Sequence, residues 1–402
     1  MMKIIENGTV TSAKGFLASG VAAGIKVNRL DMSIIASDRP AVCAVMFTQN
    51  RVPAAPVQYD RPLAAKGKCR AVVVNVGCAN ACTGEGGYAD AVEMGKLAAE
   101  AINVPVEEML VCSTGTIGRR LPMDRVRNGI KMAAEALSYD GGNAAADAIL
   151  TTDLVPKKSA VAITIDGNEV VVGGICKGSG MICPNLATTL CFITTDANVK
   201  QSSLQAATRA AVEKSFNRIT VDGDQSTNDT FAVFANGAAE TAELDETHPE
   251  WGKFVAALTE VATSLAKQIV MDGEGATKFV AITVDKAVSN EDALLACREI
   301  ANSPLFKTAC FGGDPNWGRV ISAVGNSGCE VEELKTEIYF DDVCVFNKGK
   351  LASEEDNERL AKVMAQRAFS VTVKLNLGEG EDTVYTSDLS YGYVKINGEY
   401  TT

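Results

Sequence analysis

The stretch KGSGMICPNLATTLCFITTDA, residues 177–197, decides how this chain is interpreted. A loop containing glycines and a proline leads to Ala187 and Thr188, and an apolar run typical of a β-strand follows. A threonine that opens a strand is, by itself, an ordinary β-branched strand residue. If the chain is cleaved before Thr188, however, the new α-amine becomes a base beside the threonine's own hydroxyl. The stretch therefore allows nucleophilic catalysis without a histidine.

Histidine is nearly absent, which restricts the chemistry. The chain has 402 residues and one histidine, His248, in the segment DETHPEW. We expect this polar, proline-containing segment to be a loop with a solvated imidazole. A Ser-His-Asp or Cys-His relay would depend on that one residue, and a zinc site built from several histidines is excluded.

Composition indicates a globular protein that does not bind nucleic acid. Hydrophobic residues make up 47% and charged residues 22%, an ordinary globular profile. The formal charge of −12 argues against nucleic-acid binding, for which a basic surface is expected. The first residues show no signal or transit peptide, and no run approaches the 18 apolar residues of a membrane span. We therefore expect a cytoplasmic protein of two domains or one large two-lobed unit.

The twelve cysteines show no metal-binding pattern. None forms CxxC, and only Cys78 and Cys82 lie close together. Most lie in apolar runs, where buried reduced thiols act as small hydrophobic residues. Scattered thiols in a long chain favour a reducing compartment. We expect neither a metal nor a bound cofactor.

Periodicity predicts alternating helices and strands. Apolar spacing of three and four residues predicts helices over 88–102, 124–137, 202–216, 252–270 and 354–369. Val, Ile, Thr and Phe runs predict strands over 41–47, 71–76, 160–166, 169–175, 189–195, 279–286, 335–346 and 370–377. IDGNEVV is expected to be a hairpin with DGN as its turn. The fold class is layered α/β with mixed sheets. A lobe boundary near 187 and one near 245–250 both fit.

Two further motifs have simple structural interpretations. KGSG at 177–180 lacks the Walker and GxGxxG patterns, so a turn is favoured over a phosphate-binding loop. VDGDQSTNDT at 221–230 begins like a calcium loop. Thr227 stands where that loop requires glycine, and Val233 stands where it requires glutamate. We therefore expect a turn rich in side-chain-to-backbone hydrogen bonds.

Several long motifs, in the same order along the chain, resemble the ornithine acetyltransferase family, the glutamate N-acetyltransferases of arginine biosynthesis. They are the 177–197 stretch, STGTIG (113–118), TTD (151–153), ITVDGDQSTNDT (219–230), DGEGATK (272–278), GGDPNWGR (312–319) and YVKINGEYTT (393–402). The resemblance covers essentially the whole chain. It implies a layered α-β-β-α, N-terminal-nucleophile-like fold of two lobes.

The resemblance also implies self-cleavage between Ala187 and Thr188. The products would be an α-chain of 1–187, carrying the oxyanion hole and the substrate lysine, and a β-chain of 188–402. Two copies of each would form an α2β2 heterotetramer. Thr188 becomes the nucleophile, and the Thr114 hydroxyl and Gly115 N–H become the oxyanion hole. The implied substrate-binding residues are Thr151, Thr152, Lys177, Thr188, Glu274, Asn397 and Thr402.

The implied reaction moves an acetyl group from N2-acetyl-L-ornithine to L-glutamate through a threonyl acyl-enzyme, with ping-pong kinetics. Lys177 supplies a cation for the α-carboxylate shared by both amino acids, and Glu274 pairs with the cationic end of ornithine. No cofactor is needed, and the motifs leave open whether acetyl-CoA also serves as co-substrate. Which of Thr151 and Thr152 contacts the substrate is open as well.

The chain departs from the family pattern beside the nucleophile. Leu186 and Thr189 replace the usual methionines. Leucine is nearly volume-conserving, whereas Thr189 adds a second hydroxyl and competes for the role of nucleophile. Val76 and Cys78 also replace more usual residues. The alternatives are an N-terminal-nucleophile aminopeptidase or amidase on a similar scaffold, and a nucleotide-binding module without chemistry.

Overall fold

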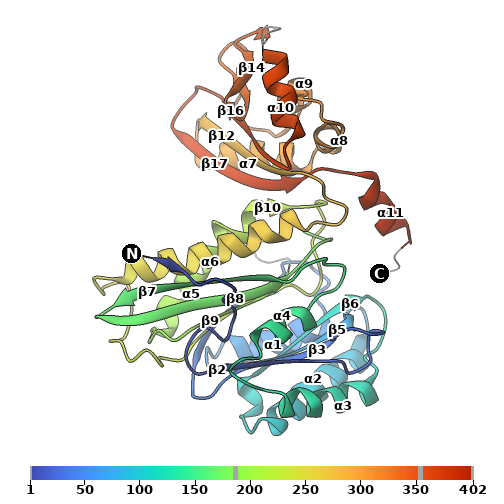
Figure 1. The fold of residues 1–402 in the computed structure, drawn as a ribbon, viewed down its shortest axis with the longest axis vertical. Coiled ribbons are helices and arrows are strands. Elements are labelled where there is room, and N and C mark those ends of the chain that lie inside the picture. The colour runs from blue at the N-terminus through green and yellow to red at the C-terminus, as the bar shows by residue number, and fades with distance from the viewer. Residues whose placement is uncertain (1, 184–188, 352–355, 400–402) are drawn as a thin grey trace. The chain divides into compact units, whose positions relative to one another are not determined.

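The computed structural model describes residues 2–183, 189–351 and 356–399 (Figure 1). The chain forms two compact units, one of residues up to 217 with 225–269, the other of residues 218–224 with 270 onward. We had expected the boundary between the lobes near 187 or at 245–250. The division between the two compact units lies at neither place. The strand β9 (Leu190–Thr195) pairs with strands on both sides inside the first unit, which is why the chain does not divide near 187.

The first unit contains two sheets. Among the described residues, one sheet has the order β1-β7-β8-β9-β11-β4 and the other β2-β3-β5-β6. The strands of the first sheet besides β9 are β1 (Lys3–Ile4), β7 (Lys157–Ile165), β8 (Asn168–Lys177), β11 (Thr230–Ala235) and β4 (Val42–Phe47). Those of the second are β2 (Phe16–Val21), β3 (Met32–Ser37), β5 (Ala71–Cys78) and β6 (Met109–Thr116).

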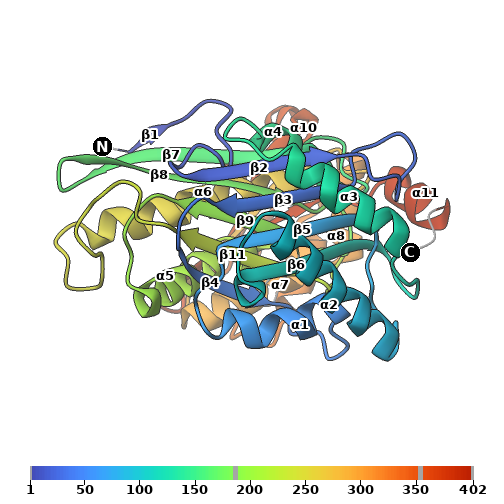
Figure 2. The same cartoon turned by 90° about the horizontal axis from the view of Figure 1, so that it is seen from below.

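The two sheets face each other across an apolar core and carry helices on their outer faces. Phe16, Val72 and Leu110 of one sheet share a buried cluster with Phe192 and Phe234 of the other. The remaining elements of this unit are α1 (Ala55–Ala64), α2 (Gly84–Ala101), the 3-10 turn Val106–Glu108, α3 (Met123–Glu135), α4 (Gly142–Ala148), α5 (Gln201–Glu213) and α6 (Trp251–Met271). Helices α1 to α3 cover the four-stranded sheet, and α6 lies along β7 and β8 (Figure 2). The predicted α-β-β-α layering is confirmed for this unit.

The hairpin predicted at IDGNEVV is present. Strands β7 and β8 pair antiparallel, with Ile165 opposite Asn168. Asp166 and Gly167 between them have φ of 51° and 78°. Two successive positive φ values define the tight turn that Asp-Gly favours, because the backbone twist then matches the strands.

Helix α6 is more apolar than expected, because no run of the sequence was expected to approach a membrane span. Its 21 residues are long and apolar enough to cross a membrane by length and composition alone. Half of its most apolar 18-residue stretch is buried. The buried positions, such as Phe254, Leu258, Val261 and Leu265, recur every three or four residues. This spacing is that of a helix covering a sheet.

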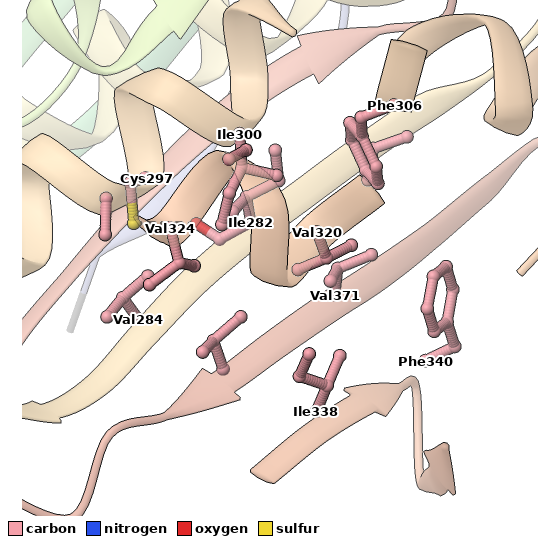
Figure 3. Packing of buried hydrophobic residues seen from close by; sticks show 14 of the residues in the cluster. Ile282, Val284, Cys297, Ile300, Phe306, Val320, Val324, Ile338, Phe340 and Val371 are labelled. Atoms are coloured by element: carbon pink, nitrogen blue, oxygen red, sulfur yellow. Dashed lines mark hydrogen bonds between the residues drawn. The ribbon is translucent and has the colours of Figure 1, made fainter. Parts of the chain in front are cut away.

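The second unit is a seven-stranded sheet with order β10-β17-β12-β16-β13-β14-β15 among the described residues. Its strands are β10 (Ile219–Thr220), β12 (Phe279–Ala287), β13 (Glu337–Phe340), β14 (Val343–Asn347), β15 (Lys350–Leu351), β16 (Ala368–Lys374) and β17 (Gly380–Ser387). Its helices are α7 (Asn290–Asn302), α8 (Pro304–Gly312), α9 (Trp317–Asn326), α10 (Asn357–Ala365) and α11 (Tyr391–Glu399), and the 3-10 turn Phe216–Arg218 precedes β10. Ile282 and Val371 of the sheet pack against Ile300 of α7 and Val324 of α9 (Figure 3).

Two predicted elements of this unit have different bounds. The strand expected over 335–346 is two antiparallel strands, β13 and β14, which turn at Asp341 with φ of 47°. The helix expected to reach 369 ends at Ala365, because the chain enters β16 at Ala368. The other predicted helices and strands are present with shifted ends.

Candidate active site

The two residues predicted to form the oxyanion hole lie at the end of β6. Strand β6 runs parallel to β5 with Gly77 opposite Gly115, and the register then breaks at a bulge. Gly115 has a φ of 129°, and a Cβ there would lie 2.4 Å from the Gly77 carbonyl carbon. Only glycine tolerates both this conformation and this approach. The bulge thus fixes the backbone at the position where the oxyanion hole is predicted.

Lys177 and Thr114 lie on different sheets of the first unit, and their side chains are in contact. Lys177 is the last residue of β8 and is half-buried. Its Nζ lies 3.5 Å from the Thr114 Oγ1, the outer limit of a hydrogen bond. Two residues predicted for the same site, 63 positions apart, are therefore neighbours.

A buried ion pair holds the loops around Lys177. Asp153 and Lys157 have fully buried side chains, and Lys157 Nζ lies 2.5 Å from Asp153 Oδ1. The same Oδ1 accepts the Gly178 N–H at 2.8 Å, and Oδ2 accepts the Thr151 N–H at 2.9 Å. Burial opposes ionisation of Asp153, but Lys157 and then Lys177 outweigh it and hold the pKa of the carboxyl below its usual range. Asp153 thus holds both Thr151 and the residue that follows Lys177.

Asp153 belongs to the TTD motif, but no separate role was predicted for it or for Lys157. Lys157 opens β7, but a second lysine and a serine follow it, so no local pattern distinguishes it. The side chain of Thr151 also turns toward Asp153, with its Oγ1 3.3 Å from Oδ2. Thr152 is half-buried beside it.

Lys26 completes this side of the site and was not predicted. Its Nζ lies 3.0 Å from the Thr151 carbonyl oxygen and 3.4 Å from that of Leu150. Its stem lies over the bulge, since a Cβ on Gly77 would be 2.9 Å from the Lys26 Cγ. Burial, then the charges of Arg29 and Lys177, lowers the pKa of this lysine.

The strand that follows the predicted nucleophile is held by β11. The two strands are parallel, with Leu190 opposite Thr230, and the Thr230 N–H donates to the Thr189 carbonyl at 2.9 Å. Two buried oxygens here, Thr189 Oγ1 and Asp229 Oδ2, have no hydrogen-bond partner among the described residues. Burial raises the pKa of Asp229 well above its usual range. Such orphaned groups are uncommon in a folded protein.

The segment 221–230 forms the expected turns rather than a cation loop. The Asp222 side chain accepts the Asp224 N–H at 3.3 Å, and Ser226 Oγ accepts the Asn228 N–H at 3.2 Å. Asn228 Nδ2 also donates to the carbonyls of Ser113, at 2.8 Å, and Ala79, at 2.6 Å. The motif thereby anchors the strand that carries Thr114.

The second unit brings together two more predicted substrate residues. Asn397 of α11 donates from Nδ2 to Glu274 Oε2 at 2.8 Å. Glu274 is nearly buried, whereas Asn397 is exposed. The loop of Glu274 is held by Asp388, whose Oδ1 accepts the N–H groups of Thr277 and Lys278 at 2.8 and 2.9 Å. Glu274, on a loop that Asp388 holds, and Asn397, on α11, therefore form one polar group.

Most of the predicted site residues lie in the described part of the chain, but the predicted nucleophile does not. Ala187, Thr188 and Thr402 lie outside the described residues, and their roles stay predictions. The first unit holds Thr114, Gly115, Thr151, Thr152 and Lys177, and the second holds Glu274 and Asn397.

The lone histidine is in a loop, as predicted, but it is not solvated. Only 12% of the His248 side chain is exposed. Its Nε2 lies 3.3 Å from Asp166 Oδ1, and its Nδ1 accepts the Glu250 N–H at 3.1 Å. These contacts cover the ring, so the expectation of a solvated imidazole was wrong. The cysteines follow the prediction more closely: all twelve lie in described segments and are free, and most are buried.

Comparison with known proteins finds relatives that match nearly the whole chain. Residues 17–402 match the model of the ArgJ family. The arginine biosynthesis bifunctional protein ArgJ of Geobacter sulfurreducens is 50% identical over 392 residues, which cover 97% of this chain and 100% of the relative. The protein of the same name from Caldanaerobacter subterraneus subsp. tengcongensis is 46% identical, with full coverage of both chains.

A solved structure of ornithine acetyltransferase complexed with ornithine, from Mycobacterium tuberculosis, is 41% identical and has a TM-score of 0.44. The match covers 46% of this chain and 100% of that one. The family match and the two full-length relatives decide the assignment, and the chain belongs to the ArgJ family.

Proposed function

We propose that this chain transfers an acetyl group from N2-acetyl-L-ornithine to L-glutamate, in arginine biosynthesis, through an acyl-enzyme on Thr188. Membership of the ArgJ family and the names of the full-length relatives support this activity. The structural observation that carries it is the pairing of Lys177 Nζ with Thr114 Oγ1 at 3.5 Å. A carboxylate-binding cation and a hydroxyl donor for an oxyanion are thereby adjacent, as an N-acyl amino acid substrate requires.

The first half-reaction forms the acyl-enzyme. The Thr188 hydroxyl oxygen attacks the acetyl carbonyl carbon, and the α-amine of Thr188 takes the hydroxyl proton. The Thr114 hydroxyl and Gly115 N–H stabilise the oxyanion, a contribution worth about 10²–10³ in kcat for one such donor. The C–N bond then breaks, the α-ammonium returns the proton to the leaving nitrogen, and ornithine departs. The acetyl group stays as an ester on Thr188.

The second half-reaction repeats these steps with glutamate. Its α-amine attacks the ester carbonyl, and the threonine oxygen leaves and recovers its proton. Lys177 holds the α-carboxylate that both amino acids share, and Glu274 with Asn397 receives the cationic end of ornithine. Thr152 rather than Thr151 contacts the substrate, because the Thr151 amide and hydroxyl are directed to Asp153. Thr402 completes the binding residues.

Maturation cleaves the chain between Ala187 and Thr188 into chains of 1–187 and 188–402. Strand β8 precedes the cut and β9 follows it, and the two are paired from Val172 opposite Thr195 to Lys177 opposite Leu190. Both chains therefore contribute to one sheet and remain associated without a covalent link. The assembly is an α2β2 heterotetramer in the cytoplasm, and the free thiols fit such a reducing compartment.

The relatives' name "bifunctional protein" supports a second activity, the acetylation of glutamate by acetyl-CoA. In this activity acetyl-CoA is a co-substrate that loads the same Thr188, and no resident cofactor takes part. Incubation with acetyl-CoA and glutamate alone, without acetylornithine, tests it. Formation of N-acetylglutamate is expected, and its absence limits the enzyme to the recycling reaction.

The test of the main proposal uses N2-acetylornithine with a labelled acetyl group. With glutamate present, the label should appear in N-acetylglutamate, and Thr188→Ala should remain one uncleaved, inactive chain. Thr189→Ala is the matched control, because it removes the neighbouring hydroxyl and leaves the cleavage site. Label released as free acetate at the same rate with or without glutamate would identify a hydrolase instead. Tight nucleotide binding with no acyl chemistry would identify a binding module.

A further inference from the structure

A closed ring of contacts in the first unit joins Lys26 and Lys177 to the predicted oxyanion-hole residues. Lys26 Nζ contacts the Thr151 carbonyl at 3.0 Å, and the Thr151 N–H donates to Asp153. Asp153 accepts the N–H of Gly178, the residue after Lys177. Lys177 reaches Thr114, whose neighbour Gly115 pairs with Gly77, and Gly77 lies beneath the Lys26 stem. Apart from the contact between Thr151 and Asp153, these contacts join segments that are 25 or more positions apart in the sequence.

This ring carries an excess of positive charge. Lys26 and Lys177 place two half-buried ammonium groups on it. The buried carboxylate of the ring, Asp153, is already compensated by Lys157 at 2.5 Å. Asp31, close to Lys26 in sequence, accepts the backbone N–H groups of Ala23 and Lys26, at 2.6 and 2.7 Å. Within the described part of the chain, no carboxylate makes an ion pair with the Lys26 ammonium.

The two substrates differ in the charge they bring to such a ring. N2-acetylornithine has one carboxylate and a cationic side chain, whereas glutamate has two carboxylates. One cation suffices for the carboxylate that both share. A second carboxylate needs its own cation, because burying an anion without a partner is costly.

We propose that Lys26 is a specificity-determining residue whose ammonium binds the side-chain carboxylate of glutamate, while Lys177 binds the α-carboxylate. This inference rests on the proposed function and goes beyond it by naming the group that recognises the acceptor. A cation at this position also disfavours an acceptor with a positively charged side chain. Lys26 therefore acts mainly in the second half-reaction.

The alternative is that Lys26 only holds the Thr151 carbonyl in place. Lys26→Gln separates the two roles, because a glutamine amide can still donate to that carbonyl but carries no charge. Lys26→Arg keeps the charge. Lys66→Gln is the matched control, since Lys66 is an exposed lysine away from the ring. Thermal unfolding of each variant checks that the fold is retained.

The experiment measures the two half-reactions separately on the mature enzyme. Ornithine release reports on the donor, and discharge of the acyl-enzyme reports on glutamate and on glutamine, which lacks the side-chain carboxylate. For Lys26→Gln we expect KM for glutamate to rise at least about tenfold more than KM for acetylornithine, because one charge-assisted contact is lost. The preference for glutamate over glutamine should fall by about the same factor, and Lys26→Arg should recover most of both.

Equal effects on donor and acceptor, no effect at all, or no recovery with arginine would overturn the inference. A wild-type enzyme that transfers no acetyl group to glutamate would instead overturn the proposed function. The wild-type measurement thus separates the two failures.

Discussion

Each unit buries a lysine, and the two lysines have opposite surroundings. Lys157 in the first unit is fully buried and lies 2.5 Å from the Asp153 carboxylate. Lys307 in the second unit is 4% exposed and donates to Thr386 Oγ1 at 2.9 Å and to the Ser387 carbonyl. No carboxylate contacts Lys307 directly in the described residues, and burial lowers its pKa to about 8.

The two buried lysines therefore have different consequences, because one is paired with a carboxylate and the other is not. In the first unit the Asp153 carboxyl stays ionised and orients Gly178 and Thr151 beside Lys177. In the second unit the lysine titrates near physiological pH and lies outside the Glu274 and Asn397 group. The first unit is thus a preorganised electrostatic frame, whereas the buried charge of the second unit lowers its stability.

Removing one member of the compensated pair should have the largest effect. Lys157→Met leaves Asp153 as an uncompensated buried charge, and we expect a loss of about 3–5 kcal/mol in the free energy of unfolding. Urea unfolding measures this loss. The double variant Asp153→Leu with Lys157→Met should recover much of the stability but no activity, because Gly178 and Thr151 lose their acceptor. Equal stability of the single and double variants would contradict a coupled pair.

A second prediction concerns the bulge between β5 and β6, where Gly115 lies opposite Gly77. Gly115→Ala should lower kcat by about 10²–10³, because the new Cβ meets the Gly77 backbone and displaces the predicted oxyanion donor. Gly118→Ala is the matched control. Gly118 also has a positive φ, 81°, but a Cβ there meets no atom within 4 Å. A similar loss of kcat in both variants would mean that φ, and not the contact with Gly77, is responsible.

Lys307 should make its own contribution to the pH dependence of stability. Its pKa falls from 10.5 in the unfolded chain to about 8 in the fold, so between these values the unfolded state binds more protons. The contribution of Lys307 to stability should therefore rise with pH from 8 to 10.5, by at most about 3 kcal/mol, and be flat below 8. The other titrating groups are the same in wild type and in Lys307→Met, so the difference between their free energies of unfolding isolates this lysine. From pH 7.5 to pH 10 that difference should shift in favour of the wild type, and an unchanged difference would contradict the prediction.

The smallest effect is expected for Asn397, an exposed residue of α11 in the second unit. Asn397→Ala removes one hydrogen bond to Glu274 and should raise KM for acetylornithine about three- to tenfold. The melting temperature should stay unchanged, because the side chain is exposed. Steady-state kinetics with both substrates measures the effect. A marked loss of stability would show that Asn397 supports α11 rather than the substrate.

Much of the fold could be predicted from local patterns. Strands β7, β8 and β9 and the turn at Asp166 and Gly167 follow from β-branched runs and turn chemistry, which act between neighbours in sequence. Of the described strands, the sequence patterns did not predict β1, β2, β3, β6, β10, β11, β15 and β17. In β2 and β17 small and polar residues interrupt the hydrophobic pattern, and the all-buried β3 and β11 show no alternation.

The site residues likewise fall into those that the sequence motifs predicted and those that only the structure revealed. The motifs led to Thr114, Gly115 and Lys177, and the structure places these three together. Lys26 and the Asp153–Lys157 pair were missed because their roles depend on tertiary contacts. Lys26 meets Thr151 across 125 positions, and a separation of that length leaves no periodic signal in the sequence.

The central claim is that Thr188 becomes an N-terminal nucleophile that carries the acetyl group. The most direct measurement is mass spectrometry of the enzyme after rapid quenching with N2-acetylornithine, without glutamate. We predict two chains, the second beginning at Thr188 and bearing one acetyl group that glutamate removes. An intact chain with full transferase activity, or an acetyl group located on another residue, would contradict the account.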